Sequence, residues 1–213
     1  MTVIIFQDVF IPNLVYGMGS SSEILMTAPK ILLPLAHGFE EIEAVTVIDI
    51  LRRAGADLTI AALQGKEVTG GHDITITCDA QLGDLLDRVW DWIILPGGTE
   101  GVNRMLANDD LMAILKKHHS QQKAIAAICA APLILDREML TNGQAITIHP
   151  AIAPQIQFTK IDNQPVIKKN LLITGRSAGA AMTFAFTLVK EIFGHEKAIQ
   201  LNKGVMAELP ANF

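Results

Sequence analysis

From Lys30 onward, apolar runs of strand length alternate with segments whose apolar residues recur at helical spacing. The expected strands are KILLPLA (30–36), DLTIAAL (57–63), DWIILPGG (91–98), AIAAI (124–128), QAITIH (144–149) and LLITG (171–175). The expected helices cover 40–55, 111–122 and 177–194, and KEVTG and HDITITC predict two short strands around a glycine-rich turn. Alternating strands and helices form right-handed crossovers, so we expect an α/β fold with a doubly wound, mainly parallel sheet covered on both faces.

Five loops follow the expected strands and should meet at one edge of the sheet. Chemistry in such sheets gathers at the carboxyl ends of the strands. The loops are HGFEEIE (37–43), PGGTEG (96–101), CAAP (129–132), HPAI (149–152) and GRSAG (175–179). We therefore look for the functional residues in these loops.

Size, charge and cysteine content narrow the class of protein. The chain has 213 residues, enough for one domain with a core that needs neither disulfides nor metals. Its formal charge is −5 and its Lys and Arg residues are dispersed, which argues against specific nucleic-acid binding and acidic membrane surfaces. Its apolar runs are shorter than the ~18–20 residues of a membrane span. Two separated cysteines fit a reducing, cytoplasmic setting.

The first 29 residues differ from the rest of the chain. An apolar stretch is followed by the small polar run GMGSSSE, and no basic residue precedes Lys30, which argues against a signal peptide. We interpret 1–29 as an N-terminal extension, with Met26 as an alternative start, and 30–213 as the domain.

Cys129 lies where an apolar strand meets the start of a helix at Pro132. Such an elbow holds a side chain clear of the sheet, and the small residues Ala127, Ala130 and Ala131 leave room for it. A helix amino terminus can lower a thiol pKa from about 8.5 to ~3.5–7.5. We therefore expect Cys129 to be largely thiolate at neutral pH. The alternative is an inert cysteine buried in a core strand.

Other candidate groups follow the neighbouring strands. Gly97 and Gly98 can bring backbone N–H groups close to a ligand as an oxyanion hole, although Pro-Gly-Gly is also an ordinary turn. Glu43 lies among apolar residues, so we expect a raised pKa and an acid–base role, although acids are common at helix starts. His149 ends a strand and can pair with the thiol; a satisfied polar histidine is the alternative.

The remaining candidates are interpreted as structural. The adjacent His118 and His119 fit the solvated face of a helix, and Cys78 closes a strand. We find no spacing typical of metal ligands, so we expect neither a metal nor a cofactor.

The chain resembles the ThiJ/PfpI superfamily, in the branch of the Parkinson-disease-associated deglycase (DJ-one), and is similar to bacterial YajL. The resemblance runs in order from Lys30 to about Gly194. It rests on ILLPLAHGFEEIEAVTVIDILRRAGADLTIAAL, DWIILPGGTEG, KAIAAICAAPLIL, ITIHP and LLITGRSAGAAMTFAFTLV.

This resemblance implies a flavodoxin-like, cofactor-free homodimer with a reactive, oxidisable cysteine at Cys129. It implies that Glu43 contacts the sulfur, that His149 lies nearby, and that Gly97, Gly98 and the N–H of Ala130 are the amide donors.

Three further positions are candidate anion-binding groups. Arg53 and Arg176 match the family, with surface ion pairing as the alternative, whereas His72 stands where the family often has arginine. The family usually reads Cys-Ala-Gly-Pro, but Ala131 replaces the glycine here. The peptidase branch has a histidine directly after the cysteine, where this chain has Ala130, so a peptidase or amidase-like hydrolase is disfavoured.

The activities implied by the resemblance are conversion of methylglyoxal to lactate and repair of early glyoxal adducts on proteins or nucleotides, with a role in the stress response. The substrate is then a small carbonyl compound or a glycated protein or nucleotide. A redox-sensing chaperone that uses oxidisable Cys129 without turnover is the alternative, and a thiamine-pathway role is a minor one. Enzyme and sensor require the same reactive thiol, so both stay open at this point.

Overall fold

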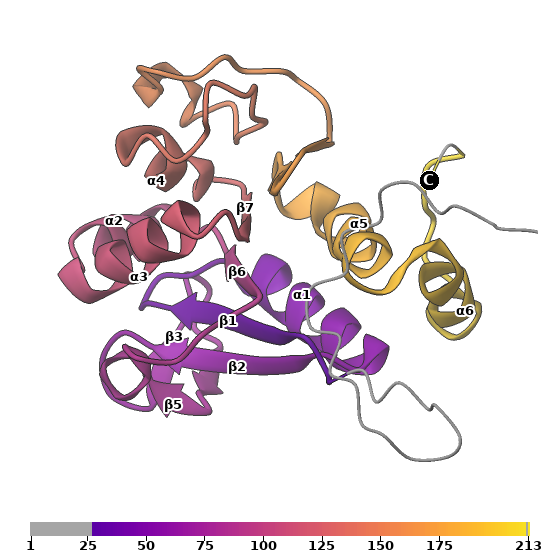
Figure 1. Cartoon of the computed structure of the whole chain (residues 1–213), viewed down its shortest axis with the longest axis horizontal. Coiled ribbons are helices and arrows are strands. Elements are labelled where there is room, and N and C mark those ends of the chain that lie inside the picture. Colours follow the sequence, from indigo (N-terminus) through magenta and orange to yellow (C-terminus); the bar gives the residue numbers. More distant parts are fainter. Residues whose placement is uncertain (1–26, 212) are drawn as a thin grey trace, which may run out of the picture.

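Seven strands form the central sheet of the computed structural model, which describes residues 27–211 and 213 (Figure 1). The strand order is β5-β2-β1-β6-β7-β9-β8, and all neighbours are parallel except β8 and β9. The strands are β1 (Lys30–Leu35), β2 (Asp57–Ala62), β5 (Ala80–Gln81), β6 (Trp92–Leu95), β7 (Ala124–Ile128), β8 (Val166–Lys169) and β9 (Leu172–Gly175). A separate antiparallel hairpin consists of β3 (Glu67–Thr69) and β4 (Thr75–Thr77).

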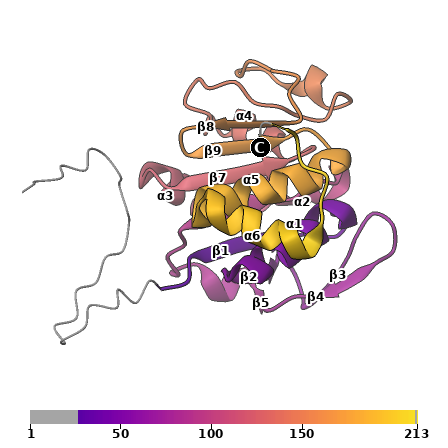
Figure 2. The ribbon, with the colours of Figure 1, turned by 90° about the vertical axis from the view of Figure 1, so that its right-hand side faces the viewer.

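Helices cover both faces of this sheet, as Figures 1 and 2 show. One face carries α1 (Glu41–Ala54) and α5 (Ala181–Phe193), with α6 (His195–Val205) packed against both. The other carries α2 (Thr99–Leu106), α3 (Asp109–Ser120) and α4 (Pro132–Arg137). Short 3-10 helices span Leu82–Leu85, Ala153–Gln155 and Ala178–Ala180.

The side chains of β1 show why the sheet is buried on both faces. Ile31, Leu33 and Leu35 belong to the core under α1 and α5, whereas Leu32 belongs to the core under α2, α3 and α4. An almost continuous apolar run is what a strand buried on both faces requires. The predicted flavodoxin-like, doubly wound α/β fold is confirmed.

The predicted strand 144–149 is wrong. Ile146 makes only an isolated bridge with Ile161, although Ile146 and Ile148 are fully or almost fully buried. The position beside β9 is occupied by β8, because the two are joined by a tight turn and pair antiparallel. The segment still packs near the sheet, where the N–H of Thr147 donates to Oγ1 of Thr174 at 2.9 Å.

Several elements lie outside the sequence prediction. These are β5, β8, α2 and α6, whereas α4 begins at Pro132 as expected, and the predicted helix 177–194 begins as a 3-10 turn before α5. The proposed N-terminal extension falls, apart from residues 27–29, outside the described residues, so its boundary stays a prediction. Across residues 27–211, no helix combines the length and the apolar character needed to cross a membrane.

Candidate active site

The five predicted loops meet at the carboxyl edge of the sheet, through hydrogen bonds between their main chains. The N–H of Glu40 donates to the Gly97 carbonyl at 3.0 Å, and the N–H of Cys129 donates to the Gly175 carbonyl at 2.9 Å. The N–H of His149 donates to the Cys129 carbonyl at 2.8 Å. Residues from every one of these loops therefore surround Cys129, as the sequence predicted.

Cys129 sits on a strained elbow between β7 and α4. Its φ is +63°, a left-handed conformation that costs an L-residue roughly 1–2 kcal/mol. Such backbone strain is characteristic of functional sites. The Cys129 side chain is half-buried, so it is not part of the fully buried core. Ala131 has an ordinary helical φ of −65°, so its methyl group adds no backbone strain to the elbow.

Glu43 is fully buried beside the cysteine. Its Oε2 accepts the N–H of Gly97 at 2.9 Å, and its Oε1 has no hydrogen-bond partner among the described residues. Burial raises the pKa of Glu43 to about 7, although the Cys129 side chain and the Gly97 N–H favour ionisation and so lower it. The negative charge of Glu40 raises the same pKa further. The raised pKa agrees with the expectation for Glu43, and its acid–base role stays a prediction.

Gly97 and Gly98 are required by the close approach of their neighbours. A Cβ added at Gly97 would lie 2.5 Å from Oε2 of Glu43 and 2.7 Å from Cβ of Cys129. Gly98 has a φ of +91°, and a Cβ there would overlap the carbonyl oxygen of Gly38. These two positions therefore exclude larger residues for steric reasons, and Gly98 for conformational reasons as well.

The amide donors divide into two roles that the sequence did not separate. The N–H of Gly97 is already committed to Glu43, so in this structure Gly97 positions the acid rather than serving as an open oxyanion donor. The N–H groups of Gly98 and Ala130 interact with the Cys129 sulfur and lower its pKa. Gly98 and Ala130 are therefore the donors available to a negative charge that forms at the thiol.

The thiol itself differs from the sequence prediction. Burial raises the pKa of Cys129, and the charge of Glu43 and hydrogen bonding with it raise that pKa further. The expected lowering by the helix is outweighed because α4 has six residues and starts only at Pro132. The prediction of a largely ionised Cys129 is wrong while Glu43 carries its charge.

His149 joins the site through its main chain. Its half-buried ring accepts the N–H of Ala151 at Nδ1, at 3.2 Å, so the neutral ring carries its proton on Nε2. Nε2 is then a hydrogen-bond donor at the same edge of the sheet as Cys129.

The three candidate anion-binding residues are engaged elsewhere. Arg53 pairs with Asp49 on α1 at 2.8 Å, and Arg176 donates to the Asn163 carbonyl at 3.2 Å. The ring of His72 lies 2.9 Å from Oε2 of Glu41, and this hydrogen bond raises the pKa of His72. The structure does not assemble these groups into an anion site.

One cluster was not expected from the sequence. Glu40, Glu41 and His72 place three potential metal-ligand atoms within 4.8 Å of one another, a donor set that divalent transition metals accept. Both oxygens of Glu41 are already used, however, because Oε1 accepts the N–H of His72 at 2.6 Å and Oε2 faces its ring. The two hydrogen bonds between Glu41 and His72 hold the β3–β4 turn against α1, and this structural role explains the cluster. No local motif could reveal it, since His72 comes from a distant hairpin.

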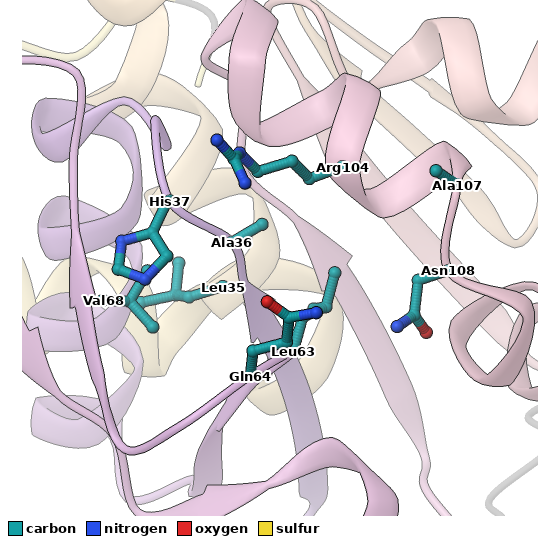
Figure 3. Close-up of a pocket in the computed structure, with 9 residues that line it drawn as sticks. All are labelled: Leu35, Ala36, His37, Leu63, Gln64, Val68, Arg104, Ala107 and Asn108. Atoms are coloured by element: carbon teal, nitrogen blue, oxygen red, sulfur yellow. The ribbon is translucent and has the colours of Figure 1, made fainter.

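A separate cavity of about 200 Å³ opens at the carboxyl ends of β1 and β2 (Figure 3). His37, Arg104 and Asn108 are among the polar side chains around it. Cys129, Glu43 and His149 are not among its lining residues, and Arg104 is paired with Glu100 at 2.6 Å. The thiol chemistry therefore belongs to the strand edge around Cys129, not to this cavity.

Residues 29–191 match the DJ-1/PfpI family. Protein dj-1beta of Drosophila melanogaster is 36% identical over 178 residues, which cover 82% of this chain and 95% of that protein. Its crystal structure has a TM-score of 0.82 and 34% identity, covering 85% of this chain and all of that one. The glutathione-independent glyoxalase DJR-1.2 of Caenorhabditis elegans is 30% identical over 179 residues, which cover 81% of this chain and 92% of that protein.

Some relatives are much longer. Protein DJ-1 homolog A of Arabidopsis thaliana is 35% identical over 181 residues, 84% of this chain, and the match spans 46% of that protein. The chain thus spans about half the length of this plant relative. Similarity to YajL in particular stays a prediction.

Proposed function

We propose, since the chain belongs to the DJ-1/PfpI family, that it is a cofactor-independent, cysteine-dependent glyoxalase that converts small 2-oxoaldehydes such as methylglyoxal into 2-hydroxy acids. The observation that carries the proposal is the half-buried Cys129 thiol on its strained elbow beside buried Glu43. The similarity to DJR-1.2, a glutathione-independent glyoxalase, favours this reaction over the redox-sensing chaperone.

The first step is addition of the thiol to the aldehyde. The Cys129 sulfur forms a bond to the aldehyde carbon while its proton passes to Glu43, whose Oε1 is free to accept it. The aldehyde oxygen becomes an alkoxide, which the N–H groups of Gly98 and Ala130 stabilise before it takes up the proton that Glu43 received from the thiol. The product is a hemithioacetal on Cys129.

The second step moves a proton between the two carbons of the substrate. Glu43, which is ionised again once the alkoxide has taken its proton, removes the C–H proton of the hemithioacetal carbon, and the resulting enediol takes a proton back from Glu43 at the neighbouring carbon. The Nε2–H of His149 is a donor to the substrate oxygen during this transfer. This gives a 2-hydroxy thioester. Water then adds to the thioester, the carbon–sulfur bond breaks, and the 2-hydroxy acid leaves as the thiol is restored. The net reaction adds one water and requires no external oxidant or reductant.

The same chemistry extends to early adducts of 2-oxoaldehydes on proteins, because these release or present the same carbonyl carbon. The homodimer and the cytoplasmic location also belong to this proposal. Ile42 and Val45 on α1 are 58% and 45% exposed, which gives a second copy an apolar surface to cover.

The direct test is lactate formation from methylglyoxal in the absence of glutathione and added metal. We expect steady turnover by the wild-type chain and at least a hundredfold loss in Cys129→Ser, since a serine hydroxyl is a far weaker nucleophile at neutral pH. Equal lactate formation by both proteins would rule out a mechanism through Cys129.

A further inference from the structure

We infer that the Cys129 site selects uncharged 2-oxoaldehydes and adducts over those that carry a carboxylate or phosphate, with Glu40 as the specificity-determining residue. This inference rests on the proposed function for its substrate class. It concerns the charge that surrounds the thiol, which can also be measured without turnover. It disfavours glycated nucleotides as substrates.

Glu40 brings a negative charge to the thiol site. Its N–H donates to the Gly97 carbonyl at 3.0 Å, and Gly97 packs against both Glu43 and Cys129. The Glu40 side chain is only 20% exposed, so water screens its charge less than that of a surface acid. Burial is the main cause of the raised pKa of Glu43, and the charge of Glu40 adds to it. Glu40 therefore adds a second carboxylate near Glu43, the acid that contacts the Cys129 side chain.

A protonated His72 does not cancel this charge. His72 lies 2.9 Å from Oε2 of Glu41 and 3.9 Å from Oε2 of Glu40. At most one positive charge on His72 therefore faces two carboxylates, and the cluster keeps a net negative charge. Arg53 is paired with Asp49, and the guanidinium of Arg176 donates to a backbone carbonyl.

This balance sets the expected preference. A substrate carboxylate held at ~7 Å from one uncompensated negative charge, at an effective dielectric constant of ~40, is disfavoured by about five- to tenfold relative to an uncharged isostere. The effect should shrink at high salt, because Cys129 is only half-buried and dissolved ions screen charges near it.

Alkylation of Cys129 by iodoacetamide and iodoacetate measures the charge around the sulfur directly. The two reagents are close in size and differ by one negative charge. We expect the ratio of their rate constants at Cys129, followed by peptide mass, to exceed the ratio for free cysteine by more than about five- to tenfold. Glu40→Gln should lower the ratio by about five- to tenfold, and the charge of Glu43 should keep the ratio above the free-thiol value. Glu196→Gln on α6, which changes the net charge equally, should leave it unchanged.

A ratio equal to that of free cysteine would overturn the inference. An unchanged ratio in Glu40→Gln would overturn the assignment to Glu40. Both outcomes are independent of whether the protein turns over any substrate.

Turnover of a matched substrate pair gives the second readout. 4,5-Dioxovalerate carries a carboxylate, and its amide is uncharged with the same 2-oxoaldehyde. We expect a kcat/KM about five- to tenfold higher for the amide, narrowing in Glu40→Gln. Equal kcat/KM values would overturn the inference. If neither compound reacts while the alkylation ratio is high, the proposed function fails and the charge preference stands.

Discussion

Replacing Glu43 with glutamine separates the reactivity of the thiol from its turnover. Glutamine keeps the shape of the side chain and an acceptor for the Gly97 N–H, but it cannot take a proton. Loss of one negative charge on the order of 5 Å from the sulfur, at an effective dielectric constant of ~20, is worth about 3 kcal/mol, or roughly two pKa units. The pKa of Cys129 should therefore fall in Glu43→Gln, because a charge that raises it is gone.

In Glu43→Gln we expect faster alkylation of Cys129 and slower turnover of methylglyoxal. Reaction of Cys129 with iodoacetamide near pH 7 should accelerate, whereas kcat/KM for methylglyoxal should drop by roughly 10²–10⁴-fold without the general base. In the wild type, kcat/KM should rise as the pH passes about 7, because only ionised Glu43 can accept the thiol proton. That limb should vanish in Glu43→Gln.

Alkylation profiles against pH and lactate formation are measured on the same preparations, with the free energy of unfolding in urea as the check on folding. A Glu43→Gln protein with wild-type kcat/KM would refute the role of Glu43 as the base. A thiol pKa that stays the same or rises would refute the electrostatic coupling.

Three further predictions concern positions around and away from the site. Gly98→Ala should lose roughly 1–3 kcal/mol of stability and most lactate formation, because φ is +91° and the new methyl group would meet a backbone carbonyl. The control is Gly204→Ala on α6, where the space is open; this variant should be neutral or stabilising in urea unfolding. His118 is 4% exposed and burial lowers its pKa to about 4, so the unfolded chain binds a proton at His118 more tightly than the folded chain does. The free energy of unfolding should therefore fall by about 3 kcal/mol as the pH drops from 6.5 to 4, and by less in His118→Gln. An equal fall in the two proteins would count against this role of His118. Cys78 is 5% exposed whereas Cys129 is half-buried, so native-state alkylation at pH 8 should modify Cys129 and spare Cys78; rapid modification of Cys78 would contradict its burial in the native state.

The sequence predicts correctly those elements whose burial follows from a local pattern of apolar residues. β1, β2, β6 and β7 are apolar runs between turn residues, and α1 has apolar residues at helical spacing before Gly55. The segment 144–149 carries an equally good apolar pattern, but its place in the sheet depends on β8, a half-polar strand whose pairing is non-local. The prediction for 144–149 is therefore right about which residues are buried and wrong about their hydrogen bonding as a strand.

The candidate site divides in the same way. The position of Cys129 and the burial of Glu43 follow from loops at the carboxyl edge of a parallel sheet, and both could be predicted. The protonation of the thiol could not, because burial and the charge of Glu43 outweigh a short helix. His118 shows the same limit: it was expected in solvent, but its Nε2 contacts the Ala124 carbonyl of β7 at 2.9 Å.

Titration of the Glu43 carboxyl carbon by ¹³C NMR is the most direct test of the central claim, that a buried carboxyl group beside Cys129 serves as its base. The account predicts a midpoint near pH 7, which burial produces, and a changed midpoint in Cys129→Ser. A midpoint near the ordinary value of 4.5, the same in both proteins, would contradict it.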